Sequence, residues 1–159
     1  MLSRGDAVVY KCRGVYKVEE VGKLDFSFVD GKKDYYTLQS IDNQRDKAYV
    51  PIDDDKNIRR PVSEQKAKEL LDHLAEVGIL NVKNEKYREQ EYKDCISGFC
   101  PENWVKVLKT LYSRTKRRGS MTSMDKKYQM LLEHALSSEM NYVLGIPAGE
   151  MTELIKKSE

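Results

Sequence analysis

Hydrophobic and polar residues alternate along the first third of the chain. The alternating segments are rich in Val, Tyr and Ile, are separated by turn signals such as Asp30-Gly31, and cover residues 7–10, 15–21, 35–38 and 47–52. A period of two predicts β-strands with one buried face. Because the spacing leaves no room for crossover helices, we expect a small antiparallel sheet that closes on itself.

At Pro61 the hydrophobic period changes from two to about 3.6 residues. This pattern predicts helices over residues 64–77, 85–96, 102–118 and 123–144, and a short terminal helix around residues 151–155. Ser63 and Ser123 are the expected N-caps, and Gly119 and Gly145 are expected to end the two longest helices. None of these helices is long enough to be stable alone, so they must share a core as a bundle. We therefore predict an α+β protein with a sheet domain at 1–61 and a helical domain at 62–159.

The last predicted strand has the features of a binding edge. Ala48 and Val50 fall on one face, whereas Lys47 and Tyr49 fall on the other. Pro51 cannot donate a ladder hydrogen bond, which fits a strand at the margin of a sheet. An open edge can accept a strand from a partner protein. We expect the contact to be made by Lys47, Ala48, Tyr49, Val50 and Pro51.

Composition and motifs narrow the classes of function. The 159 residues are 40% hydrophobic and 34% charged. The sequence has no apolar run of bilayer length and no signal-peptide core, so we expect a cytoplasmic protein that does not bind membranes. Cys12, Cys95 and Cys100 lack paired metal-site spacing and are expected to be reduced thiols. His73 and His134 have no second ligand at metal spacing. We expect no catalysis, cofactor, metal or small-molecule substrate.

Positive charge gathers on the predicted helical domain. No acidic residue lies between Asn103 and Met124, and the cations of this region and of the next helix start are Lys106, Lys109, Arg114, Lys116, Arg117, Arg118, Lys126 and Lys127. Cations near a helix C-terminus are favoured by the helix dipole, so the cluster has a purely stabilising interpretation. The alternative is a phosphate-binding surface on DNA. Trp104 is in phase with the apolar stripe of its helix and is expected in the core.

The order of several motifs resembles the CarD/CdnL family of bacterial transcription regulators. The segment from Gly5 to Tyr10, then Gly14-Val15, Tyr35 to Leu38 and Tyr49-Val50-Pro51, resembles that family's RNA-polymerase-interacting domain. The segments 107–114, 124–128 and 138–140 are similar to its helical half. The resemblance implies a Tudor-like barrel that adds a strand to the β subunit of bacterial RNA polymerase. It also implies a helical domain that meets promoter DNA at the upstream edge of the bubble and modulates the open complex.

Two family positions hold different residues here. Tyr49 stands where well-known members have a basic residue, and Asn84 stands where many members have a tryptophan that wedges into the minor groove. Lys126 matches a basic position of the family, and Arg88 and Arg114 are further candidates. The expected DNA contacts are Asn84, Arg88, Lys106, Lys109, Arg114, Lys116, Arg117, Arg118, Lys126 and Lys127. An alternative hypothesis is a protein-interaction adaptor whose helical domain binds protein instead of DNA.

Overall fold

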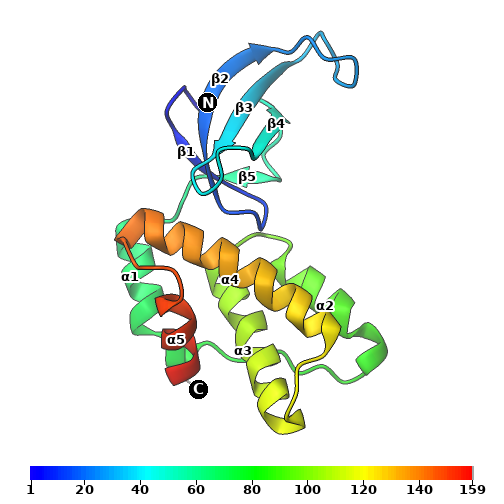
Figure 1. Ribbon diagram of the computed structural model, residues 1–159, viewed down its shortest axis with the longest axis vertical. Coiled ribbons are helices and arrows are strands. Elements are labelled where there is room, and N and C mark those ends of the chain that lie inside the picture. The colour runs from blue at the N-terminus through cyan, green and yellow to red at the C-terminus, as the bar shows by residue number, and fades with distance from the viewer. Residues whose placement is uncertain (159) are drawn as a thin grey trace. The chain divides into compact units, whose positions relative to one another are not determined.

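The computed structural model describes residues 1–158 and divides into two compact units, residues 1–61 and a unit that begins at Val62. The first unit is a sheet of short strands and the second contains the helices (Figure 1). The protein is therefore α+β.

The first unit is one antiparallel sheet. Its strands are β1 (Ala7–Tyr10), β2 (Val15–Lys23), β3 (Asp34–Ser40), β4 (Lys47–Pro51) and β5 (Ile58–Arg59). They pair in the order β4-β3-β2-β1-β5, which makes β4 and β5 the two edges. Because β4 and β5 do not pair with each other within residues 1–158, the sheet is open, and the closed barrel that we expected is not confirmed.

One face of this sheet carries the hydrophobic core of the unit. Tyr36 lies opposite Val50, and Leu38 lies opposite Ala48. These four residues are buried together with Val8, Tyr16 and Val18. The alternation therefore places the predicted faces of β4 correctly, with Ala48 and Val50 turned inward.

The connection between β2 and β3 is longer than the Asp30-Gly31 signal suggested. Asp30 does form a turn, since its carbonyl oxygen accepts a hydrogen bond from the Lys33 amide at 3.2 Å. The strands, however, end at Lys23 and resume at Asp34. The turn thus lies inside a long loop, residues 24–33, and not at a tight hairpin.

The second unit consists of α-helices and two 3₁₀ turns. They are α1 (Glu64–Asp72), η1 (Leu74–Glu76), η2 (Glu85–Tyr87), α2 (Arg88–Ile96), α3 (Pro101–Arg118), α4 (Ser123–Leu144) and α5 (Glu150–Lys157). Ser63 caps α1 as predicted, because its Oγ accepts the Lys66 amide hydrogen bond at 3.1 Å. The predicted cap Ser123 is wrong, since Thr122 precedes α4 and accepts from the Asp125 amide.

Helix α3 is at the centre of the second unit and packs against α2, α4 and α5. Its residues Trp104, Leu108 and Leu111 are fully buried, as are Leu132 and Met140 of α4. Gly119 ends α3 in the left-handed conformation (φ 83°) that a glycine adopts without strain. Only residues 119–122 separate α3 from α4, so the last turn of α3 and the first turn of α4 lie near each other (Figure 1).

Candidate functional site

Strand β4 presents a free edge for pairing. It pairs with β3 on one side, and no other strand of the described residues pairs with it. Two backbone hydrogen bonds at the ends of β4 show which of its residues face β3. The Ser40 amide donates to the Asp46 carbonyl at 3.0 Å, and the Ile52 amide donates to the Asp34 carbonyl at 3.1 Å. Hydrogen-bonded positions alternate in an antiparallel pair. The backbone of Ala48 and Val50 therefore faces β3, whereas the N–H and C=O groups of Lys47 and Tyr49 face away from the sheet.

Pro51 marks the end of this free edge. It has no N–H group, and its carbonyl oxygen accepts a hydrogen bond from the Asp54 amide at 3.0 Å. An added strand would therefore find its two outward donors at Lys47 and Tyr49. The same alternation has two consequences. The side chains of Ala48 and Val50 point into the core, and the backbone groups of Lys47 and Tyr49 point away from the sheet.

An aromatic cluster lies beside the edge on the outer face of β4. The ring of Phe26 meets the ring of Tyr49 edge to face, with 5.1 Å between centroids, and stacks on Phe28 at 5.2 Å. Phe28 is 76% exposed. Lys47, two residues before Tyr49 in β4, forms an ion pair with Glu19 at 3.1 Å. The sequence analysis did not predict this cluster; the available signal was the pair of phenylalanines in the loop 24–33.

The exposed cations of the second unit gather where α3 ends and α4 begins. Lys116, Arg117 and Arg118 are exposed on the last turn of α3, and Lys126 and Lys127 are exposed on the first turns of α4. Lys127 is also paired with Glu89 at 3.3 Å. The structure thus brings five of the predicted DNA-contacting residues to one end of the helix pair, while Lys106 lies earlier on α3 and is half-buried.

Three other predicted DNA-contacting cations interact within the protein. Lys109 is 4% exposed, and its ammonium donates to the carbonyl oxygens of Leu74 and Val77. Arg88 is 6% exposed and Arg114 is half-buried. Lys109 and Arg88 are therefore not part of the exposed group of cations, because their charges are buried and already hydrogen-bonded within the protein.

Arg88 and Arg114 belong to a closed ring of polar contacts. The Glu85 carboxylate accepts two hydrogen bonds from Arg88, from Nε at 2.7 Å and Nη2 at 2.6 Å, and pairs with Arg114 at 3.2 Å. Arg114 also pairs with Asp125 at 3.3 Å, and the Tyr92 hydroxyl donates to Asp125 at 3.0 Å while accepting from Arg88 at 3.2 Å. The Arg88 hydrogen bonds, with the charges of Arg88, Arg114 and Arg118, lower the pKa of Glu85 to about 2.

Asn84 has a local structural role. Its side-chain oxygen accepts a hydrogen bond from the Lys86 amide at 3.0 Å and so caps the turn η2. The residue is exposed. At the position where the resemblance implies a wedging tryptophan, this chain therefore presents a short polar side chain that hydrogen-bonds its own backbone.

Comparison with known protein families identifies the first unit. Residues 2–62 match the family described as "CarD-like/TRCF RID domain". Over these residues, the chain is similar to that family. A search of curated proteins gave no match.

The RID domain accounts for the whole sheet, because the match spans β1 to β5. It is an RNA-polymerase-interacting domain, which supports a transcription-related interaction role and confirms the resemblance for residues 2–62. The free edge of β4 and the aromatic cluster both lie inside it. The helical unit, with the cations described above, lies outside the matched residues.

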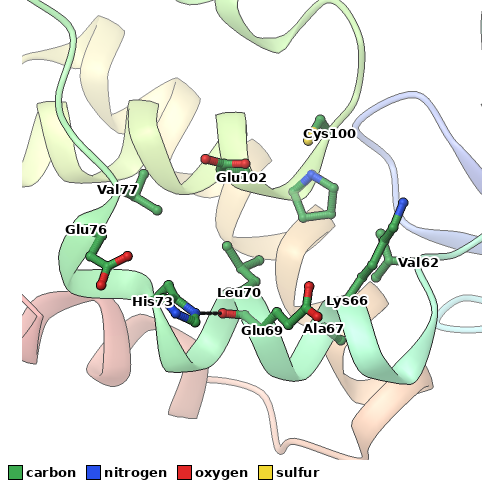
Figure 2. A pocket seen from close by; sticks show the side chains of 11 residues that line it. Val62, Lys66, Ala67, Glu69, Leu70, His73, Glu76, Val77, Cys100 and Glu102 are labelled. Atoms are coloured by element: carbon green, nitrogen blue, oxygen red, sulfur yellow. Dashed lines mark hydrogen bonds between the residues drawn. The ribbon is translucent and has the colours of Figure 1, made fainter.

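The helical unit also contains an acidic pocket of about 610 Å³ between α1, the turn η1 and the start of α3 (Figure 2). Leu70 and Val77 line it together with the carboxylates of Glu69, Glu76 and Glu102, which outnumber the single ammonium of Lys66. His73 lies in the same wall, where its Nδ1 is 2.8 Å from the Glu69 carbonyl oxygen. That hydrogen bond, followed by the charge of Glu76, raises the pKa of His73.

Neither a membrane span nor a metal cluster is found in the part of the chain that the structure describes. No helix among residues 1–158 is long and apolar enough to cross a bilayer. Over the same residues, no three His, Cys, Asp or Glu side chains are grouped as metal ligands would be. No disulfide joins Cys12, Cys95 and Cys100.

Proposed function

We propose that the RID domain binds the β subunit of a bacterial RNA polymerase by adding a strand to β4. The protein then acts in the cytoplasm as a non-catalytic regulator of transcription. The single observation that carries this proposal is the outward-facing backbone of Lys47 and Tyr49 at an edge that no strand of residues 1–158 covers. Main-chain bonds along such an edge supply affinity for an extended segment, and alternate side chains supply specificity.

Substitutions at Tyr49 separate the two kinds of contact. In Tyr49→Pro the outward donor is lost but the ladder with β3 keeps its bonds, because Ala48 and Val50 make them. In Tyr49→Val the donor remains and only the ring is removed. We expect Tyr49→Pro to abolish capture of purified polymerase by the full chain and Tyr49→Val to weaken capture only in part. Equal capture by Tyr49→Pro and wild type would exclude strand addition at β4.

We further propose that the helical unit contacts promoter DNA near the upstream edge of the bubble and so modulates the stability of the open complex. The support is the group of exposed cations Lys116, Arg117, Arg118 and Lys126, which can neutralise phosphates without reading bases. With a polar side chain at Asn84, this contact is electrostatic. DNA affinity should therefore depend steeply on salt and little on sequence.

Salt dependence tests the DNA contact. Each neutralised phosphate contributes a slope of about −0.9 to the plot of log affinity against log salt concentration, so four exposed cations give a slope no steeper than about −4. Lys126→Glu should make the slope shallower by about one, and Lys109→Met, which changes a buried cation, should not change it. A slope that Lys126→Glu leaves untouched would remove these residues from the interface.

The acidic pocket favours a second candidate function, an adaptor whose helical unit binds protein. Its apolar lining and its three carboxylates suit a basic segment with aliphatic side chains. A fork-junction promoter fragment distinguishes the two functions when polymerase is present. A DNA-contacting regulator adds protection upstream of the bubble, whereas an adaptor adds none.

A further inference from the structure

A second pocket in the helical unit is lined by an excess of positive charge. It has a volume of about 790 Å³ and lies between the segment 79–82, the start of α2 and the C-terminal half of α3. Four arginines line it, Arg88, Arg114, Arg117 and Arg118, against one carboxylate, that of Glu85. A pocket of this size and charge fits an anion larger than a single carboxylate.

Glu85 occupies the place that an external anion would take. Its two oxygens receive two parallel hydrogen bonds from Arg88, and one of them also lies 3.2 Å from Arg114. Two-pronged binding of this kind is the geometry in which a guanidinium holds either a carboxylate or a phosphate. The contacts that Glu85 makes are therefore ones that two phosphate oxygens could also make.

The two sides of this contact differ in how firmly they are held. The side chains of Arg88 and Arg114 are only 7% and 12% exposed, and the Tyr92 hydroxyl and the Asp125 carboxylate hold them from behind. The Glu85 side chain is 62% exposed and comes from a three-residue turn. The arginines are thus preorganised, whereas the carboxylate can rotate into solvent without leaving a cavity in the core.

We propose that this arginine-lined pocket binds a phosphate group and that Glu85 fills the site when no phosphate is bound. A multiply charged phosphate gains more than the carboxylate does, because Arg117 and Arg118 line the same pocket and add two further charges. Displacing Glu85 keeps Arg88 and Arg114 paired, so that no buried charge is left without a counter-ion. The proposal does not depend on whether the RID domain binds the β subunit.

The test uses the full chain and inorganic tripolyphosphate as the probe, with sodium chloride added to keep the ionic strength constant. Glu85→Gln removes the competing charge but keeps a similar shape, and we expect it to bind tripolyphosphate about tenfold more tightly than wild type. Glu89→Gln is the matched control. Glu89 also has a lowered pKa, owing to hydrogen bonds from Tyr128 and Lys127, but it does not line the pocket, so its loss should leave tripolyphosphate affinity unchanged.

A second variant keeps the test decisive if Glu85→Gln fails to fold. Arg117→Gln combined with Arg118→Gln changes exposed residues only, and it should weaken tripolyphosphate binding to the otherwise unchanged chain about tenfold or more.

A short DNA duplex then identifies the source of the phosphate. If duplex affinity follows tripolyphosphate affinity across the variants, the site takes backbone phosphates; if only tripolyphosphate responds, it takes free polyphosphates. If Glu85→Gln and the double arginine variant both bind tripolyphosphate as wild type does, the proposal is overturned.

Discussion

Lys109 carries its charge inside the helical unit, where its ammonium donates to the carbonyl oxygens of Leu74 and Val77. Hydrogen bonds from a charged donor contribute more than neutral ones, and their loss leaves buried carbonyls poorly satisfied. We predict that Lys109→Met lowers the free energy of unfolding by about 1–3 kcal/mol, measured by urea denaturation. Lys116→Met, at an exposed position of the same helix, should stay within about 0.5 kcal/mol of wild type. Equal stability of the two variants would contradict the role that we assign to the buried ammonium.

Glu85 gives the protein a dependence of stability on acidic pH. Its pKa falls from 4.5 to about 2 in the folded protein, chiefly through the hydrogen bonds from Arg88. A lowered pKa stabilises the fold above the unfolded value, and this stabilisation is lost as pH falls toward the folded value. We expect the urea midpoint of wild type to exceed that of Glu85→Gln at pH 6, and the difference to shrink between pH 4.5 and pH 2. A difference that is constant over this range would show that the Glu85 charge is not responsible.

At the scale of elements, the loop 24–33 extends the interface that we propose at β4. Phe28 is 76% exposed and stacks on Phe26, which in turn contacts Tyr49 of the edge strand. Burying such a side chain against a partner gains about 1.5–3 kcal/mol. We therefore predict that Phe28→Ser weakens polymerase binding roughly tenfold in a titration while leaving the unfolding midpoint unchanged. Met130→Ser, at a residue of α4 that is 66% exposed, is the control and should bind polymerase as wild type does.

Periodicity predicted the elements well because burial repeats along each of them. The four longer strands and the long helices α3 and α4 were found, but β5 was missed, since two residues are too short to show a period. Whether the sheet closes could not be predicted, because pairing between strands distant in the chain has no local signal. The helix predicted over 64–77 is divided at His73, where α1 ends before the turn that buries Leu74.

The candidate site was harder to predict than the fold, because the residue type alone does not tell whether a lysine is exposed or buried. Helix phase was the signal available: Lys109 lies four residues after Val105 and three before Tyr112, both buried, so it falls on the inward stripe of α3. Arg88 is likewise four residues before the buried Tyr92. Helix phase does not reveal the partner of Arg88, because Glu85 binds it from the separate turn η2.

At the scale of the whole molecule, the protein joins two units that each have a hydrophobic core of their own. The proposed polymerase contact lies in the first unit and the proposed DNA contact in the second. Linking two binding modules makes the second binding event intramolecular, with an effective concentration in the millimolar range for short linkers. Under the proposed function, a weak electrostatic DNA contact would act at a promoter because the RID domain would already hold the protein on the polymerase there.

A mixture of two single-site variants tests this linkage. Tyr49→Pro should lack the polymerase contact and keep the cations, and Lys126→Glu should keep the polymerase contact and weaken the DNA contact. If both contacts must be on one chain, the equimolar mixture should stabilise an open complex no better than Lys126→Glu alone, as measured by the lifetime of the complex after a competitor is added. Wild type is measured at half the total concentration of the mixture, so that each kind of contact is present at the same concentration in both samples. Under these conditions wild type should change the lifetime of the open complex. If the mixture instead reproduces the wild-type lifetime, the two contacts act independently and the tether contributes nothing, since each function would then be supplied by a separate molecule.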